Sequence, residues 1–176
     1  MPIKHTATIP SMKNKRKAKV LAIFLIMAGV VSILLSNSPP APDVSFKTIS
    51  NKTIQLKSLQ GKAVLITFWA SNCPSCLKEI VDFKRLYQDY HQKGLEIIAI
   101  AMQYDRPNYV VNASKSYQIP YHIVLDLDGK LATAFGDVSL TPSTFLVNPK
   151  GGIAFQVTGA FDLEAMQKRI EVMLPD

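Results

Sequence analysis

The stretch FWASNCPSCLKE, residues 68–79, contains the only two cysteines of the chain, Cys73 and Cys76. It follows the run AVLITF, residues 63–68, which is short, apolar and β-branched, as expected for a strand buried on both faces. From Pro74 onward, apolar residues recur at helical spacing, so Cys73 lies at the start of a predicted helix. The Cys-x-x-Cys spacing alone suits a redox centre, a zinc site or a haem attachment site, and the rest of the chain must distinguish them.

The remaining sequence gives little support to a metal site. Zinc would need two further Cys or His ligands, but there is no third cysteine, and His5, His91 and His122 lie far apart. Haem attachment would need a histidine directly after Cys76, where the chain has Leu77. A purely structural disulfide would close so small a loop that it removes little entropy from the unfolded chain. We therefore expect a reactive dithiol without a metal or a cofactor.

A helix N-terminus favours a reactive first cysteine. The thiolate is the nucleophile, and the partial positive charge of the helix end lowers the thiol pKa. Cys73 is therefore expected to attack a disulfide, and Cys76 to resolve the mixed disulfide. Pro74 suits the first helical turn, because no backbone donor is needed there, and it fixes the angle at which the dithiol is presented.

The net charge of +7 is concentrated at the N-terminus of the chain. Six of the 20 Lys and Arg residues precede the first acidic residue, Asp43, and from there on 14 basic residues accompany 13 acidic ones. The remainder is close to neutral, so a surface that binds nucleic acid has no support from composition. Residues 1–19 are predicted to form a basic cytoplasmic tail.

The basic tail leads into VLAIFLIMAGVVSILL, residues 20–35, which carries no charge. Its length lies between that of a signal-peptide core and that of a spanning helix. Because Pro39 follows the small-x-small triplet 36–38 and disfavours cleavage, we predict a transmembrane anchor or uncleaved signal over residues 20–36. A removed signal, and a true start at Met12, remain alternatives. The anchor would place the C-terminal part of the chain on the periplasmic or extracytoplasmic side of the membrane.

Residues 37–43 are predicted to form a proline-rich linker, and residues 44–176 one α/β domain. A hairpin is expected over residues 46–56, with its turn at Asn51-Lys52. The alternation of strands and helices that follows predicts a central mixed sheet flanked by helices. Further strands are expected at 63–68, 95–102, 122–125, 143–148 and 153–157, and helices at 74–93, 106–117, 128–135 and 162–174, with Gly94 as a stop signal.

These features resemble the membrane-anchored TlpA/ResA-type thiol-disulfide oxidoreductases of the thioredoxin-like superfamily. The resemblance covers about residues 44–176 and implies a thioredoxin-like fold with an N-terminal β-hairpin and a redox-active disulfide between Cys73 and Cys76. The positions that carry it are Trp69, Cys73, Pro74, Cys76, Glu79, the pair Asp128-Gly129, and Thr141-Pro142 before the predicted strand STFLVN.

The resemblance also implies roles for residues around the dithiol. Thr141 and Pro142, joined by a cis peptide bond, are expected to lie against the disulfide and to pair with an extended substrate segment. Glu79, three residues after Cys76 on the same helix face, is expected to be partly buried and to move the proton of the resolving cysteine. The other residues expected to bind substrate are Trp69, Asn72 and Pro74.

Two positions depart from the family pattern. Asn72 stands where the family usually has a tryptophan, which removes a large apolar contact and leaves the choice of partner open. Thr67 stands where thioredoxin has a buried aspartate, so proton handling is expected to fall to Glu79.

By resemblance, we expect a reductase of selected protein disulfides, for example in cytochrome c or metalloprotein maturation. It would act as a monomer, receive electrons from a membrane thiol carrier and bind no nucleic acid. A disulfide oxidase would share every motif and is the main alternative. A peroxidase of the related peroxiredoxin group would need a threonine at position 70, where Ala70 stands. A non-enzymatic copper chaperone or binding module that uses both thiols is the remaining alternative.

Overall fold

The computed structural model of the chain describes residues 38–174. The predicted tail 1–19, the predicted anchor 20–36 and the first residue of the linker lie outside the described residues. Within the described range, no helix combines the length and the apolar character needed to cross a membrane.

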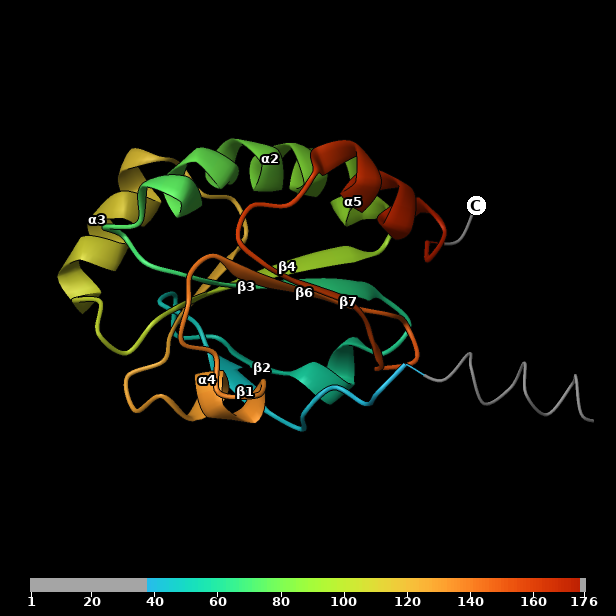
Figure 1. The fold of residues 1–176 in the computed structure, drawn as a ribbon, viewed down its shortest axis with the longest axis horizontal. Coiled ribbons are helices and arrows are strands. Elements are labelled where there is room, and N and C mark those ends of the chain that lie inside the picture. Colours follow the sequence, from blue (N-terminus) through green and yellow to red (C-terminus); the bar gives the residue numbers. More distant parts are fainter. Residues whose placement is uncertain (1–37, 175–176) are drawn as a thin grey trace, which may run out of the picture. The chain divides into compact units, whose positions relative to one another are not determined.

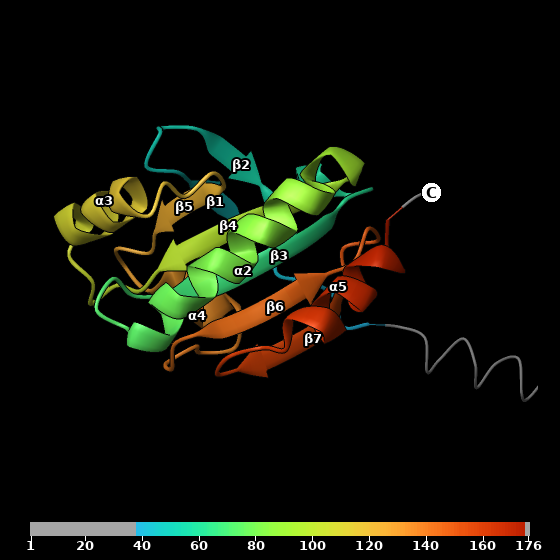
Figure 2. The same ribbon diagram turned by 90° about the horizontal axis from the view of Figure 1, so that it is seen from above.

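Five strands form the main sheet, namely β3 (Ala63–Trp69), β4 (Leu95–Ala101), β5 (His122–Leu125), β6 (Ser143–Val147) and β7 (Ile153–Thr158). Their order in the sheet is β5-β4-β3-β6-β7 (Figures 1 and 2). β3, β4 and β5 are parallel, whereas β6 runs antiparallel to both β3 and β7, so the predicted mixed sheet is confirmed. All seven residues of the central strand β3 are buried, as its apolar sequence predicts.

Helices and a small hairpin cover the two faces of this sheet. One face carries α2 (Pro74–Tyr90), α3 (Pro107–Ser116) and α5 (Leu163–Glu171). The other carries α4 (Lys130–Ala134) and the hairpin of β1 (Ser45–Lys47) and β2 (Thr53–Gln55) (Figure 1). Two short 3-10 helices, η1 (Leu56–Leu59) and η2 (His91–Lys93), complete the described elements.

The side chains of β3 alternate between two cores, because successive residues of a strand point to opposite faces. Leu65 belongs to the core beneath α2, α3 and α5, whereas Ile66 and Phe68 belong to the core that α4 and the hairpin cover. In the latter core, the ring centroid of Phe68 lies 5.6 Å from that of Phe135 and 5.9 Å from that of Phe145. β3 is therefore fixed from both faces, and so is the position at which it ends.

The N-terminal hairpin is confirmed, but its strands are shorter and its turn longer than the sequence predicted. Each strand contributes three paired residues to a separate two-stranded sheet. The turn spans residues 48–52, where Asn51 adopts a left-handed φ of 63° and the Thr48 hydroxyl accepts a hydrogen bond from the Lys52 N–H at 3.0 Å. The Thr48 N–H donates to the Lys52 carbonyl oxygen at 2.9 Å, and the Ile49 N–H donates to the Ile123 carbonyl oxygen at 2.9 Å, so the turn also bonds with β5.

The helix boundaries lie close to the predicted ones. α2 ends at Tyr90, and η2 continues the chain to Gly94, whose φ of 108° confirms it as the stop. α5 begins after Asp162, whose carboxylate accepts a hydrogen bond from the Ala165 N–H at 2.7 Å. It ends at Glu171, three residues before the predicted end.

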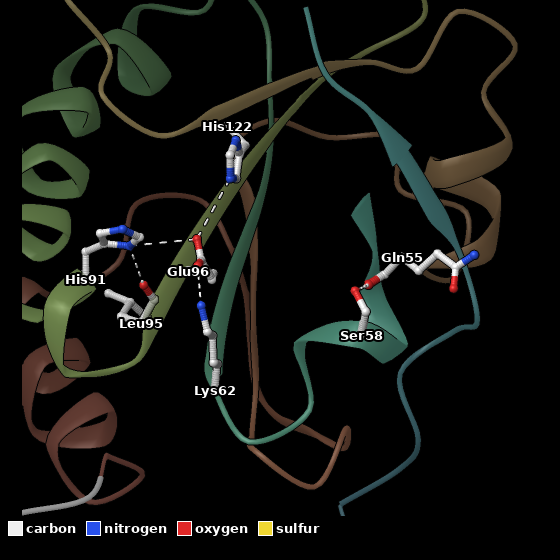
Figure 3. A network of polar contacts seen from close by, with 7 residues as sticks. All are labelled: Gln55, Ser58, Lys62, His91, Leu95, Glu96 and His122. Carbon is white, nitrogen blue, oxygen red and sulfur yellow. Dashed lines mark hydrogen bonds and ion pairs between the residues drawn. The ribbon is translucent and has the colours of Figure 1, made fainter. Parts of the chain in front are cut away.

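A buried polar network lies at the end of the sheet where β3 and β4 begin (Figure 3). Glu96 of β4 is buried, and its Oε1 accepts a hydrogen bond from Lys62 Nζ at 2.7 Å. Its Oε2 lies 3.8 Å from His91 Nδ1 and 3.9 Å from His122 Nε2. The pairing with the half-exposed Lys62 explains how an otherwise apolar strand tolerates a buried carboxylate.

This network predicts that His122 contributes to the pH dependence of stability. Burial lowers the pKa of His122, and the nearby Glu96 carboxylate offsets only part of that effect. Because the folded-state pKa lies below the unfolded value of about 6.5, neutral His122 favours the folded state above that pH. The contribution is lost as the pH falls through the folded-state pKa. We expect the free energy of unfolding of His122→Asn to decrease less than that of the wild type between pH 7 and 5.

Chemical denaturation of both proteins at the two pH values measures this difference. An equal loss of stability in the wild type and in His122→Asn would contradict the prediction.

Candidate active site

Cys73 is the N-cap residue of α2 and forms a disulfide with Cys76, one helical turn later. The two Cα atoms lie 5.3 Å apart. β3 ends at Trp69 in the centre of the sheet, and the three residues 70–72 lead the chain into the helix. Pro74 occupies the first helical position, where its missing N–H costs no hydrogen bond, as predicted.

The surroundings of Cys73 Sγ favour negative charge on this sulfur. The Cys76 N–H donates to Cys73 Sγ at 3.2 Å, and Ser75 Oγ lies 3.3 Å away. Free N–H groups and the partial positive charge of a helix N-terminus act in the same direction. Reduction of the disulfide would therefore leave Cys73 in a position that stabilises a thiolate.

The two sulfurs differ in accessibility. Cys73 is half-buried, whereas the Cys76 side chain is only 3% exposed and belongs to the core beneath α2. A partner molecule can therefore approach Cys73 but not Cys76. This asymmetry agrees with the assignment of Cys73 as the attacking and Cys76 as the resolving cysteine.

Thr141 and Pro142 lie against the disulfide although they are distant in the sequence. The peptide bond between them is cis, as the resemblance implied. The Thr141 carbonyl oxygen lies 3.8 Å from Cys73 Sγ, and Pro142 lines a cavity together with Cys76. The expected pairing of this backbone with a substrate segment stays a prediction, and the position suits it.

Glu79 is buried on the inner side of α2, facing the loop before α5. Its Oε1 accepts a hydrogen bond from the Phe161 N–H at 3.0 Å, whereas its Oε2 has no hydrogen-bond partner among the described residues. Burial raises the pKa of Glu79 above its ordinary 4.5, the Phe161 hydrogen bond opposes that rise, and nearby Asp82 adds to it. A carboxyl group of this kind exchanges protons closer to neutrality than an exposed one.

A small cavity adjoins both Glu79 and Cys76 behind the disulfide. The volume in which the centre of a water molecule can lie is about 10 Å³. This is roughly the minimum that holds one water. Tyr121 also lines the cavity, and its pKa is raised mainly by burial and to a smaller extent by the Glu79 carboxylate. Its hydroxyl therefore keeps its proton and can donate a hydrogen bond. The remaining lining residues are Thr67, Trp69, Ile80, Phe83, Ala99, Ile119 and Pro142.

The residues expected to bind substrate separate into two groups. Asn72 and Pro74 are exposed beside Cys73, where a partner would pass. Trp69 is instead buried in the core beneath α2, because it is the last residue of β3 and its side chain points inward. The expected contact of Trp69 with a bound partner stays a prediction, and the structure shows its side chain packed in this core.

The structure adds residues that the sequence did not single out. Asp105, in the loop after β4, is buried and accepts hydrogen bonds from both the N–H and the hydroxyl of Ser71. The hydroxyl of its neighbour Tyr104 lies 3.4 Å from Thr141 Oγ1. A signal for Asp105 was present, because polar residues that follow parallel strands gather at one edge of a sheet. No sequence signal indicated that Phe161 would meet Glu79.

A disulfide presented in this way at the centre of such a sheet defines a thiol-disulfide oxidoreductase with a thioredoxin-like fold. The chain belongs to the Redoxin family, whose model matches residues 36–173. Thiol-disulfide oxidoreductase ResA of Bacillus subtilis (strain 168) is 33% identical over 150 residues, which are 85% of this chain and 82% of that protein. The ResA protein of Bacillus cereus (strain ATCC 10987 / NRS 248) is 28% identical over 175 residues, covering 93% of this chain and 100% of its own length. The resemblance read from the sequence is thus confirmed.

Solved structures agree with this assignment. A putative thioredoxin from Neisseria meningitidis has a TM-score of 0.72 and 30% identity, covering 78% of this chain and 91% of its own. StoA from Bacillus subtilis has a TM-score of 0.63 and 26% identity, covering 73% and 98%. A putative thiol:disulfide interchange protein DsbE from Chlorobium tepidum, with a TM-score of 0.71, 22% identity and coverage of 78% and 97%, shows the same fold.

Replacing Glu79 with glutamine is expected to stabilise the protein at neutral pH. The glutamine oxygen can still accept the Phe161 hydrogen bond, but the cost of burying a charge disappears. Because the folded-state pKa of Glu79 is raised, that cost is absent below the unfolded value and grows as the pH rises through the folded-state pKa. Glu79→Gln should therefore increase the free energy of unfolding by on the order of 1 kcal/mol at pH 7 and by less at pH 4.

Denaturant unfolding of the oxidised proteins at both pH values provides the measurement. Glu164→Gln, an exposed replacement of the same kind in α5, serves as the matched control. A Glu79→Gln variant that is less stable than the wild type at pH 7 would contradict the prediction, because it would show that contacts of the carboxylate outweigh the cost of burying its charge.

Proposed function

We propose that this protein reduces disulfide bonds of partner proteins outside the cytoplasm, with Cys73 as the nucleophile and Cys76 as the resolving thiol. The observation that carries the proposal is the half-buried Cys73 sulfur at the N-terminus of α2, with Cys76 buried behind it. The similarity to ResA proteins named as thiol-disulfide oxidoreductases supports it.

The exchange consists of two substitutions at sulfur. The Cys73 thiolate attacks one sulfur of the partner disulfide, so a mixed disulfide forms while the partner bond breaks and its leaving sulfur takes up a proton. Cys76, once deprotonated, attacks Cys73 Sγ, which releases the second partner sulfur as a thiol and forms the Cys73–Cys76 disulfide. Two electrons and two protons pass to the partner.

Glu79 is the residue that we propose accepts the proton of Cys76 in the second substitution. Both side chains line the small cavity behind the disulfide, and its size suits a single bridging water. The Phe161 N–H binds Oε1 and leaves Oε2 without a partner in the described part of the chain. The raised pKa of Glu79 brings its proton exchange closer to neutrality, as a general base of this kind requires.

The partner segment is expected to lie along Thr141 and Pro142 and over the exposed Asn72 and Pro74. The Thr141 carbonyl oxygen lies 3.8 Å from Cys73 Sγ, close enough to contact a segment joined to that sulfur. Asn72 offers this segment a small polar contact instead of a large aromatic one. The proposed partners are proteins whose cysteines must be reduced before a cofactor or metal is inserted, such as apocytochrome c, with electrons supplied by a membrane thiol carrier.

The reduction potential of the Cys73–Cys76 pair tests the direction of the reaction. A reductase requires a dithiol that donates electrons readily, so we expect a potential near or below about −270 mV, the level of thioredoxin. Equilibration of the full chain with glutathione or dithiothreitol buffers, followed by alkylation of free thiols, measures it. A potential near about −120 mV, the level of a strong oxidant, would instead show that the protein introduces disulfides.

The location requires a separate test. We propose that residues 20–36 anchor the chain in the cell membrane, that residues 1–19 remain in the cytoplasm, and that the Redoxin domain lies on the extracytoplasmic side. The full-length chain is then expected in the membrane fraction after alkaline carbonate washing. A mature N-terminus near Pro39 would contradict the anchor and leave the exchange reaction untouched.

A further inference from the structure

Asp105 is a buried carboxylate with no part in the exchange described above. It is 8% exposed, and each of its oxygens accepts a hydrogen bond from the same residue. Oδ2 bonds with the N–H of Ser71, and Oδ1 with the Ser71 hydroxyl at 2.7 Å. None of the ion pairs within residues 38–174 includes Asp105. The two hydrogen bonds from Ser71 are therefore the main interactions that offset the cost of burying its charge.

Ser71 belongs to the three-residue connection between β3 and the reactive cysteine. Within this connection, the Cys73 N–H bonds with the Ala70 carbonyl oxygen at 3.1 Å, which forms a tight turn. The Asp105 carboxylate binds Ser71 of this turn from a loop 34 residues further along the chain. Cys73 therefore enters α2 from a turn that a second loop immobilises.

The loop that contains Asp105 is itself fixed. The Met102 N–H donates to the Trp69 carbonyl oxygen at 3.0 Å, and the Asp105 N–H donates to the Met102 carbonyl oxygen at 2.9 Å. Tyr104 extends from the same loop to Thr141, with 3.4 Å between the Tyr104 hydroxyl and Thr141 Oγ1. Residues 102–105 thus contact both segments that flank the Cys73 sulfur.

We propose that Asp105 is a positioning residue for the exchange reaction, which it serves by fixing the turn before Cys73. The proposal rests on the proposed function and identifies a residue on which that function depends. A disulfide is stable relative to the dithiol when its two sulfurs are held together, because this raises their effective concentration. Loosening the turn therefore shifts the equilibrium toward the dithiol and raises the reduction potential.

The reduction potentials of full-length Asp105→Ala and Asp105→Asn, compared with that of the wild type, test this role. Alanine removes both hydrogen bonds, and we expect the equilibrium to move about tenfold toward the dithiol, which is about 30 mV for this two-electron couple. Asparagine can accept from the Ser71 N–H and donate to the Ser71 hydroxyl oxygen. It is therefore expected to stay within about twofold of the wild type.

Asp126 supplies a matched control. It is equally a buried carboxylate with two hydrogen bonds, from the N–H groups of Leu131 at 3.0 Å and Ala132 at 2.8 Å, but it holds the start of α4. Asp126→Ala should lose stability and keep the wild-type potential. An unchanged potential in Asp105→Ala, or an equal shift in Asp126→Ala, would overturn the positioning role.

Two further measurements separate the possible causes of failure. If Asp105→Ala does not fold, Ser71→Ala, which loses only the hydroxyl bond, should shift the equilibrium in the same direction by about threefold, and no shift would overturn the proposal. Reduction of a disulfide-bonded protein substrate by the wild type, with Cys73→Ser as the blank, tests the proposed function independently. A wild type that matches the blank removes that function whatever the potentials are.

Discussion

The burial of β3 on both faces is the constraint on which the reactive site depends. A strand packed between two cores cannot shift, so its end at Trp69 fixes where the following turn begins. The antiparallel pairing of β3 with β6 places Phe68 opposite Ser143, so the residues just before β6 must lie beside the residues just after β3. The register of the sheet thus brings Thr141 close to Cys73, and this proximity does not depend on a contact between the two residues.

Three of the four buried carboxylates among the described residues show how differently a charge can be accommodated. Glu96 has an ammonium partner at the far end of the sheet, and Asp105 has two hydrogen bonds from a single serine. Glu79 has one backbone hydrogen bond and one oxygen with no partner in the described range. The least compensated of the three is the one that shares a cavity with Cys76, and such incomplete compensation is typical of functional positions.

Much of this arrangement could be predicted from the sequence, because its signals are local. Apolar runs identified the strands, Gly94 marked the end of a helix, and the lack of a third cysteine and of a histidine after Cys76 argued against zinc and haem sites. The position of Pro142 came from family resemblance alone, since composition would make it an ordinary turn proline. Contacts between distant loops had no local signal: 34 residues separate Ser71 from Asp105, and 82 separate Glu79 from Phe161.

The unequal burial of the two sulfurs has a consequence for timing. In the proposed exchange, a small thiol from solution cannot reach Cys76, and a partner bound to Cys73 covers the other sulfur. Escape of the partner then depends on an event inside the domain, the arrival of the Cys76 thiolate at Cys73. The lifetime of the covalent complex becomes a property of the protein itself, largely independent of the thiols around it.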